Sequence, residues 1–336
     1  MPSVPMVPAH EREHIEQASA HLAEHLSSAH LDRWNRALAA IEQARVYDAF
    51  LEFNELLKEA DLDPVGRTHV QLQAVRCLRN APIDRVKTEL AFIEPHTAFQ
   101  TVVLDYRLGW LMRHRLTSPA AAEQYYDRVK DEARRLGFRA WEIAALLEKA
   151  DAAAEEGSTE EAIEGYNRIY NLSRRNGYVE YIPKALLGKG IAEIGAGRRA
   201  EGEEDLHKAY ELACRNELAP EQGLVLQALA NVYHREFKFY GLALEYYEQA
   251  RVIFERVPVW NALREDLERD INQCQADLDQ LDIAKTLGPV PITRLRQEYL
   301  TSLVNGFVGI PGIDNRSQLG ERIGLTRQAI HRNINS

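Results

Sequence analysis

The sequence contains little cysteine and no long apolar run. Its 336 residues include three cysteines, Cys77, Cys214 and Cys274, which are scattered without a motif. Their spacing suggests neither a disulfide framework nor a zinc knuckle, so a reducing cytoplasm is the simplest location. No apolar run approaches the roughly 20 residues that cross a bilayer, and we expect no membrane partner. Residues 1–9 lack the charged and apolar regions of a signal peptide, and we predict a flexible tail.

The sequence also lacks the alternation of apolar and polar residues that is typical of β-strands. From about residue 10 to residue 282, amphipathic helix patterns of roughly 12–18 residues follow one another, separated by glycine and proline breaks. Hydrophobic residues make up 45% of the chain and charged residues 27%, which is enough for a large core. We therefore predict an all-α fold.

A small residue followed by a large one recurs at a step of 40 residues. The small positions are Ala122, Ala162 and Gly202, with Ala243 one residue late, and the large positions are Tyr126, Tyr166, Leu206 and Tyr246. Such a pattern indicates that one helix approaches its neighbour closely and that a bulky side chain fills the next gap.

This pattern resembles tetratricopeptide-type repeats in an expanded form. The best match is the run from Leu229 to Tyr233 followed by the run from Ala243 to Ala250. The resemblance is clear over residues 100–257, and it implies an α-solenoid with a concave face that spans residues 10–282. Helical pairs at 31–60 and 65–94 are predicted from periodicity alone. The stretch 259–282 has no partner and is predicted to be a capping helix.

The resemblance also implies a binding groove. In several peptide-binding repeat families, asparagines of the first helix of a repeat line the concave surface and bond the backbone of a ligand. Asn231 stands at the matching place, with Gln227, His234 and Arg235 about one turn away. An amide suits this task because it both donates and accepts hydrogen bonds. The alternative is that Asn231 is an exposed polar residue or bonds a neighbouring helix.

Residues 283–292 contain two prolines and are predicted to be a linker. Residues 293–336 then carry six arginines against three acidic residues, a net charge of +3, which leaves −13 for the rest of the chain. That asymmetry is typical of a small nucleic-acid-binding module attached to an acidic body.

The end of this module resembles the helix-turn-helix of bacterial DNA-binding regulators. Gly320, Gly324 and Ile330 occupy the family's characteristic positions. The resemblance implies a three-helix module that binds double-stranded DNA, with its second motif helix in the major groove. Arg327, Gln328 and His331 would face bases, and Thr326 and Arg332 would face phosphates. Because a net charge of +3 gives a single module only weak attraction to DNA phosphates, we expect a homodimer that binds with two modules. A plain helical hairpin that closes the fold is the alternative.

The run from His10 to His14 matches the H-E-x-x-H signature of zinc proteases. Its position next to a proline-rich tail, without the downstream glycine and third histidine of one protease family, argues against that chemistry. We therefore expect no enzyme activity, no cofactor and no catalytic metal. The pairs His10/His14 and His21/His25 remain candidates for adventitious zinc or nickel binding. We place His14, His21, His25 and His30 on a histidine-rich surface.

The leading hypothesis is a transcriptional regulator whose repeat domain senses a peptide or protein partner, or mediates dimerisation. The alternative is a non-enzymatic adaptor that never binds DNA. Arginine pairs at 134/135, 174/175 and 198/199 form either a basic rim for an acidic partner or favourable helix ends.

Overall fold

The computed structural model describes residues 7–280, except for residues 44, 79–80 and 257–260. These residues form fourteen helices and no strand, so the all-α prediction is confirmed. The predicted linker and the predicted helix-turn-helix, residues 283–336, lie outside the described residues. Residues 7–9 were predicted to belong to a flexible tail, but Val7 and Ala9 are buried and the first helix begins at Ala9.

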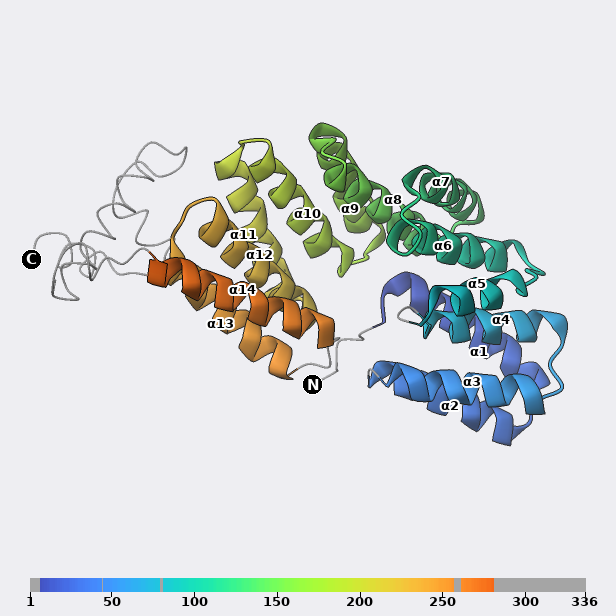
Figure 1. The fold of residues 1–336 in the computed structure, drawn as a ribbon. Coiled ribbons are helices and arrows are strands. Elements are labelled where there is room, and N and C mark those ends of the chain that lie inside the picture. Colours follow the sequence, from blue (N-terminus) through green and yellow to red (C-terminus); the bar gives the residue numbers. More distant parts are fainter. Residues whose placement is uncertain (1–6, 44, 79–80, 257–260, 281–336) are drawn as a thin grey trace, which may run out of the picture.

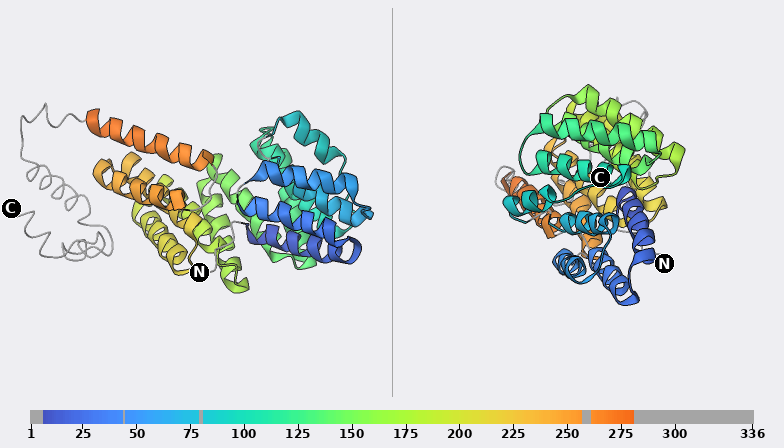
Figure 2. Two further views of the ribbon diagram at one scale, coloured as in Figure 1. Left: turned by 90° about the horizontal axis from the view of Figure 1, so that it is seen from below. Right: turned by 90° about the vertical axis from the view of Figure 1, so that its right-hand side faces the viewer.

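The first helix, α1 (Ala9–His25), is followed by helical hairpins that succeed one another along an arch (Figure 1). The hairpins are α2 (Ser28–Glu42) with α3 (Val46–Glu59), α4 (Pro64–Arg76) with α5 (Ile83–Ala91), α6 (Ala98–His114) with α7 (Pro119–Leu136), α8 (Arg139–Glu155) with α9 (Thr159–Asn176), α10 (Tyr181–Gly195) with α11 (Arg199–Arg215), and α12 (Ala219–Arg235) with α13 (Tyr240–Arg256). The last described helix, α14 (Asn261–Gln280), packs against α13 and α12. Seen from below, the N-terminal helices and α14 lie at opposite ends of the array (Figure 2).

Local sequence signals explain where the helices begin and end. Asp63 caps α4 by accepting the backbone N–H groups of Val65 and Gly66, and Pro64 fits the first turn because it has no N–H to leave unsatisfied. Gly137 ends α7 with a φ of 87°, a left-handed conformation that favours glycine and lets the chain turn into α8.

The recurring small residues are the points of close helix contact that the sequence predicts. All four are buried: Ala122, Ala162, Gly202 and Ala243. At Gly188, an added Cβ would lie 2.4 Å from the ring of Tyr166, so any larger residue would displace that ring. The assignment of Tyr246 to the large position needs correction, because Tyr247 is fully buried and Tyr246 is only partly buried. Since Ala243 comes one residue late, the aromatic residue four positions later is Tyr247.

The first helices of successive hairpins share one side of the array. Contacts join α4 to α6, α8 to α10, α10 to α12, and α12 to α14. We call this side the inner face, and it lies within the arch of Figure 1. A segment held against the inner face therefore meets side chains of these helices.

Candidate functional site on the inner face

The first half of α1 lies against the inner face. This helix packs on α4 and α8, and its side chains also bond to residues of α6 and α10. Its buried residues include His10, Glu11 and His14, with exposed fractions of 7% or less. A helix that buries charged and polar residues requires specific partners for them, because an unpaired polar group away from water is costly.

Glu11 forms the central contact. Arg107 of α6 donates two hydrogen bonds to the Glu11 carboxylate, at 2.5 and 2.7 Å, and Arg76 of α4 lies 3.7 Å from it. Burial alone raises the pKa of a carboxyl group, but the attraction of Arg107 and Arg76 outweighs burial and lowers the pKa of Glu11 well below its usual value. Glu11 is therefore ionised, and its charge is matched by a bidentate guanidinium.

His14 is held by two residues of α4. The side-chain amide of Gln73 donates to His14 Nδ1 at 2.9 Å, and His14 Nε2 lies 3.2 Å from His69 Nδ1. Because Nδ1 accepts, the proton of neutral His14 resides on Nε2, which donates to His69. Burial lowers the pKa of His14 well below its usual value and that of His69 to about 4. Both rings are therefore neutral at pH 7.

His10 reaches two further hairpins. Its Nδ1 lies 2.5 Å from the hydroxyl of Tyr181 in α10, and its ring packs edge-on against Trp141 of α8 with centroids 4.9 Å apart. Burial lowers the pKa of His10 to about 3. Arg12 extends the contact by donating to Glu180, just before α10, at 2.7 Å. We refer to His10, His14 and His69 as the inner-face histidines.

These contacts correct the histidine-rich surface predicted from the sequence. Of the residues placed on that surface, His14 is buried, and its two ring nitrogens bond Gln73 and His69. His10 is buried as well, and its Nδ1 bonds the hydroxyl of Tyr181. The apparent zinc-protease signature is therefore a set of packing and hydrogen-bonding residues. Its Glu11, the candidate base of such an enzyme, is committed to Arg107.

The predicted groove residues of α12 all bond within the fold. Gln227 and Arg235 donate to the two carboxylate oxygens of Asp270 in α14, at 3.0 and 2.9 Å. His234 Nε2 lies 2.8 Å from Asp277 of α14. The Oδ1 atom of Asn231 accepts from the hydroxyl of Tyr247 in α13 at 2.7 Å. A ligand at this place must exchange these bonds, and ligand binding by the four residues stays a prediction.

The predicted DNA-contacting residues Thr326, Arg327, Gln328, His331 and Arg332 lie beyond the described part of the chain, and their role stays a prediction. Sequence reasoning missed a groove of about 590 Å³ beside α8 and α9. It is lined by Arg134, Arg139, Glu142, Arg168, Asn171, Leu172, Arg175 and Asn176. Glu142 accepts from both Arg134 and Arg139, so two of the four arginines are neutralised in part.

Sequence reasoning also missed the role of α1. The available signal was a carboxylate between two histidines in a helix with few apolar residues. Its partners lie far along the chain: the sequence separation is 96 for Glu11 and Arg107 and 168 for Arg12 and Glu180. No local pattern connects residues at such separations.

Comparison with known proteins defines the class of fold. No protein-family model matches the chain, and no curated protein sequence matches it. The described helices nonetheless form a helical-repeat fold that solved structures of tetratricopeptide-like proteins share. Within the described part of the chain, no helix combines the length and apolar character that crossing a membrane requires.

Two solved structures are similar to this chain. One is a STAND protein, a signal transduction ATPase with numerous domains, with a tetratricopeptide repeat sensor from Pyrococcus horikoshii; its TM-score is 0.57 at 15% identity. The match covers 96% of this chain and 48% of that one, so this chain spans about half of its length. The other is the apo form of RapI, with a TM-score of 0.51 at 14% identity, covering 88% of this chain and 80% of that one. At such identities the likeness establishes the fold alone.

Proposed function

We propose that this protein is a regulator whose inner face binds a peptide or a helical segment of a protein partner, and whose residues 293–336 bind double-stranded DNA as a homodimer. One observation carries the first part. The inner face from α4 to α10 already holds a helical segment, α1, through a bidentate ion pair and directed hydrogen bonds. A surface that recognises one segment so specifically is suited to recognising another of similar chemistry.

The contacts of α1 define the partner expected there. The segment carries a carboxylate for Arg107 and Arg76, and polar groups for Tyr181 and for the His69–Gln73 pair. Such a partner binds only when α1 leaves, so its apparent affinity is its intrinsic affinity multiplied by the fraction of molecules in which α1 is released. Binding therefore shifts the population towards molecules with a free α1.

The DNA-binding part of the proposal rests on the sequence. It is supported by the helix-turn-helix resemblance at residues 315–334 and by the net charge of +3 on residues 293–336. In a homodimer, two such modules would have to match half-sites about 34–36 Å apart. A change in the repeat array that alters the spacing of the modules would alter DNA affinity.

Fluorescence anisotropy with genomic DNA fragments tests this part. We expect Arg327→Ala to lower specific affinity roughly 5- to 150-fold, the range for loss of a bidentate base contact, and we expect binding to weaken with salt. The control Arg269→Ala removes an exposed arginine of α14 that pairs with Asp266, and it should leave binding unchanged. Equal binding by both variants, or binding independent of salt, would contradict DNA recognition.

The inner face alone also supports an adaptor function without DNA. In that case a pull-down with the intact chain recovers one protein partner, and neither nuclease nor Arg327→Ala reduces the recovery. Loss of the partner on nuclease treatment would instead favour the DNA-binding regulator.

A further inference from the structure

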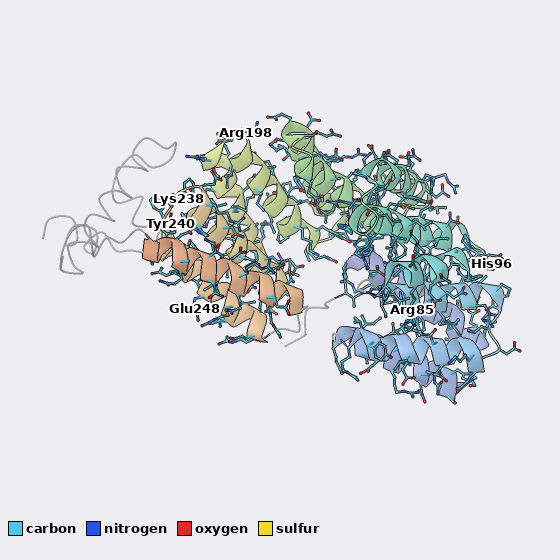
Figure 3. All side chains as sticks on the ribbon, in the orientation of Figure 1. Arg85, His96, Arg198, Lys238, Tyr240 and Glu248 are labelled. Atoms are coloured by element: carbon cyan, nitrogen blue, oxygen red, sulfur yellow. The ribbon has the colours of Figure 1, made fainter. Side chains whose placement is uncertain are left out.

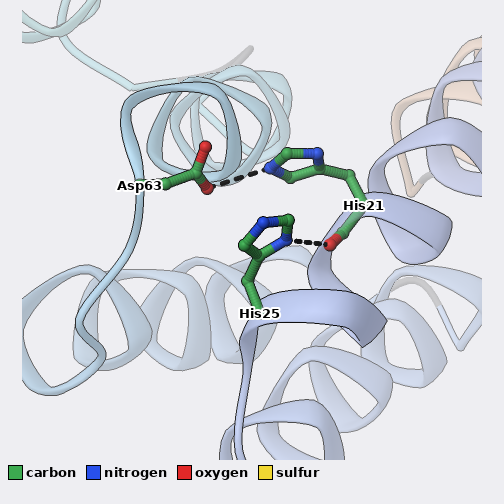
Figure 4. Close-up of side chains that lie close together, drawn as sticks. All are labelled: His21, His25 and Asp63. Atoms are coloured by element: carbon green, nitrogen blue, oxygen red, sulfur yellow. Dashed lines mark hydrogen bonds and ion pairs between the residues drawn. The ribbon is translucent and has the colours of Figure 1, made fainter.

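The second histidine pair of α1 has a different environment from the first. His21 and His25 lie one turn apart, with ring centroids 4.5 Å apart, and both face Asp63 at the start of α4 (Figure 4). His21 Nε2 is 2.9 Å from Asp63 Oδ1. One ligand atom from each of the three residues can be chosen so that all lie within 4.8 Å of one another. His25 is exposed, and the other two residues are partly exposed, so an ion has access from solvent.

Neighbouring hydrogen bonds prepare these groups for an ion. His25 Nδ1 donates to the main-chain carbonyl oxygen of His21 at 2.8 Å, which places the lone pair of the neutral ring on Nε2. This backbone bond is the arrangement that orients metal-binding histidines in known sites. Asp63 is fixed by the backbone N–H groups of Val65 and Gly66, at 3.3 and 3.1 Å. His25 and Asp63 are thus each oriented by backbone contacts, His25 through the carbonyl of His21 and Asp63 through the N–H groups of Val65 and Gly66.

We propose that His21, His25 and Asp63 bind one divalent transition-metal ion of the Zn²⁺ type. Two imidazoles and one carboxylate are a donor set that suits Zn²⁺, and water completes a tetrahedral site. Ligand atoms of such a site lie about 3.4 Å apart, given bonds of about 2.1 Å. Small rotations of the three side chains, two of them on adjacent turns of one helix, bring their ligand atoms to that separation.

The ion joins the second half of α1 to the start of α4. These two helices also meet through His14, His69 and Gln73. An ion that binds only when α1 is docked stabilises the docked state by mass action. This proposal does not rest on the proposed partner or DNA binding, because none of its three ligands belongs to the Glu11–Arg107 contact or to residues 293–336.

The test uses the intact, untagged chain after removal of metal with a chelator. Zn²⁺ is titrated in competition with a chromophoric chelator, and Co²⁺ is titrated while its visible absorption is recorded. We expect one ion per chain and a tetrahedral Co²⁺ spectrum. His25→Ala should weaken binding at least tenfold. Because His25 is exposed, the variant should keep its helical circular dichroism, which separates loss of a ligand from loss of the fold.

His96→Ala is the matched control. His96 is exposed in the connection before α6 (Figure 3), and it is not one of the three proposed ligands. Its removal should change neither affinity nor stoichiometry. In a second measurement, Zn²⁺ should slow amide exchange in α1 of the original chain and not of His25→Ala. The proposal is overturned if His25→Ala binds as tightly as the original chain, or if no stoichiometric binding is found.

Discussion

Replacement of Glu11 by glutamine tests how α1 is held. The Glu11 carboxylate is 3% exposed and accepts two hydrogen bonds from Arg107, whose own exposure is 6%. Arg107 Nε already lacks a hydrogen-bond partner among the described residues. Glu11→Gln therefore leaves a buried guanidinium without a counter-charge, which costs about 3–5 kcal/mol. The change keeps the size of the side chain, so the loss is electrostatic.

Amide hydrogen exchange measures the effect of Glu11→Gln on α1 directly. If α1 opens separately from the hairpins, a cost of about 3 kcal/mol raises the exchange rates of its amides about 100-fold. The exchange rates of amides in α12 and α13 should change little, because these helices have no described contact with Glu11. The matched control is Glu132→Gln, which removes an ion pair between Glu132 and Arg135 on the surface of α7. Many surface pairs contribute nothing measurable, so the control should exchange like the original chain.

The reasoning fails if Glu11→Gln and Glu132→Gln give the same exchange in α1. That result would mean that the buried ion pair does not hold the helix. A rise in exchange throughout the array would instead show that α1 is part of the common core and cannot leave alone.

Two further predictions concern pH and packing. The inner-face histidines have folded-state pKa values below 6.5, about 3 for His10 and about 4 for His69, so the folded protein binds fewer protons than the unfolded chain. Their stabilising contribution is therefore present above pH 6.5 and is lost as pH falls below it, by roughly 1.4 kcal/mol per pH unit for each histidine, which urea unfolding at pH 7.5 and 5.5 measures. A stability that is equal at the two pH values would contradict this linkage. Gly188→Ala places a Cβ against Tyr166 and should lower the free energy of unfolding by about 1–3 kcal/mol. At Gly195 an added Cβ meets no atom within 4 Å, so Gly195→Ala should not lower the free energy of unfolding. An equal loss of stability in both variants would argue against the close contact between Gly188 and Tyr166.

The helical array is predictable because its signals are local. The 40-residue step brings small and large residues to the same places in successive hairpins, and Gly137 and Gly177 end helices as their positions after Arg-Leu and Arg-Asn suggest. The periodic pattern misplaces the aromatic of the last hairpin, because one extra residue before Ala243 shifts the buried position from Tyr246 to Tyr247. A pattern with a fixed 40-residue step does not account for a single inserted residue, so it predicts a position one residue too early.

The candidate site is less predictable because its contacts are long-range. The spacing of His10 and His14 is compatible with a metal site, a surface or a buried face, and only the positions of Tyr181, Gln73 and His69 select the buried face. The pair His21 and His25 is visible in the sequence, whereas the approach of Asp63 depends on how α1 docks beside α4. Local spacing thus identifies possible ligands, and tertiary packing decides between them.

Binding of a separate α1 peptide most directly tests the claim that the inner face recognises a chain segment. A labelled peptide of residues 7–27 is titrated with the full-length Glu11→Gln protein, in which the protein's own α1 is weakened as a competitor. We predict saturable anisotropy, displacement by unlabelled peptide, and binding at least tenfold weaker when the peptide carries Glu11→Gln. Equal binding of the two peptides, or no binding of either, would contradict the account.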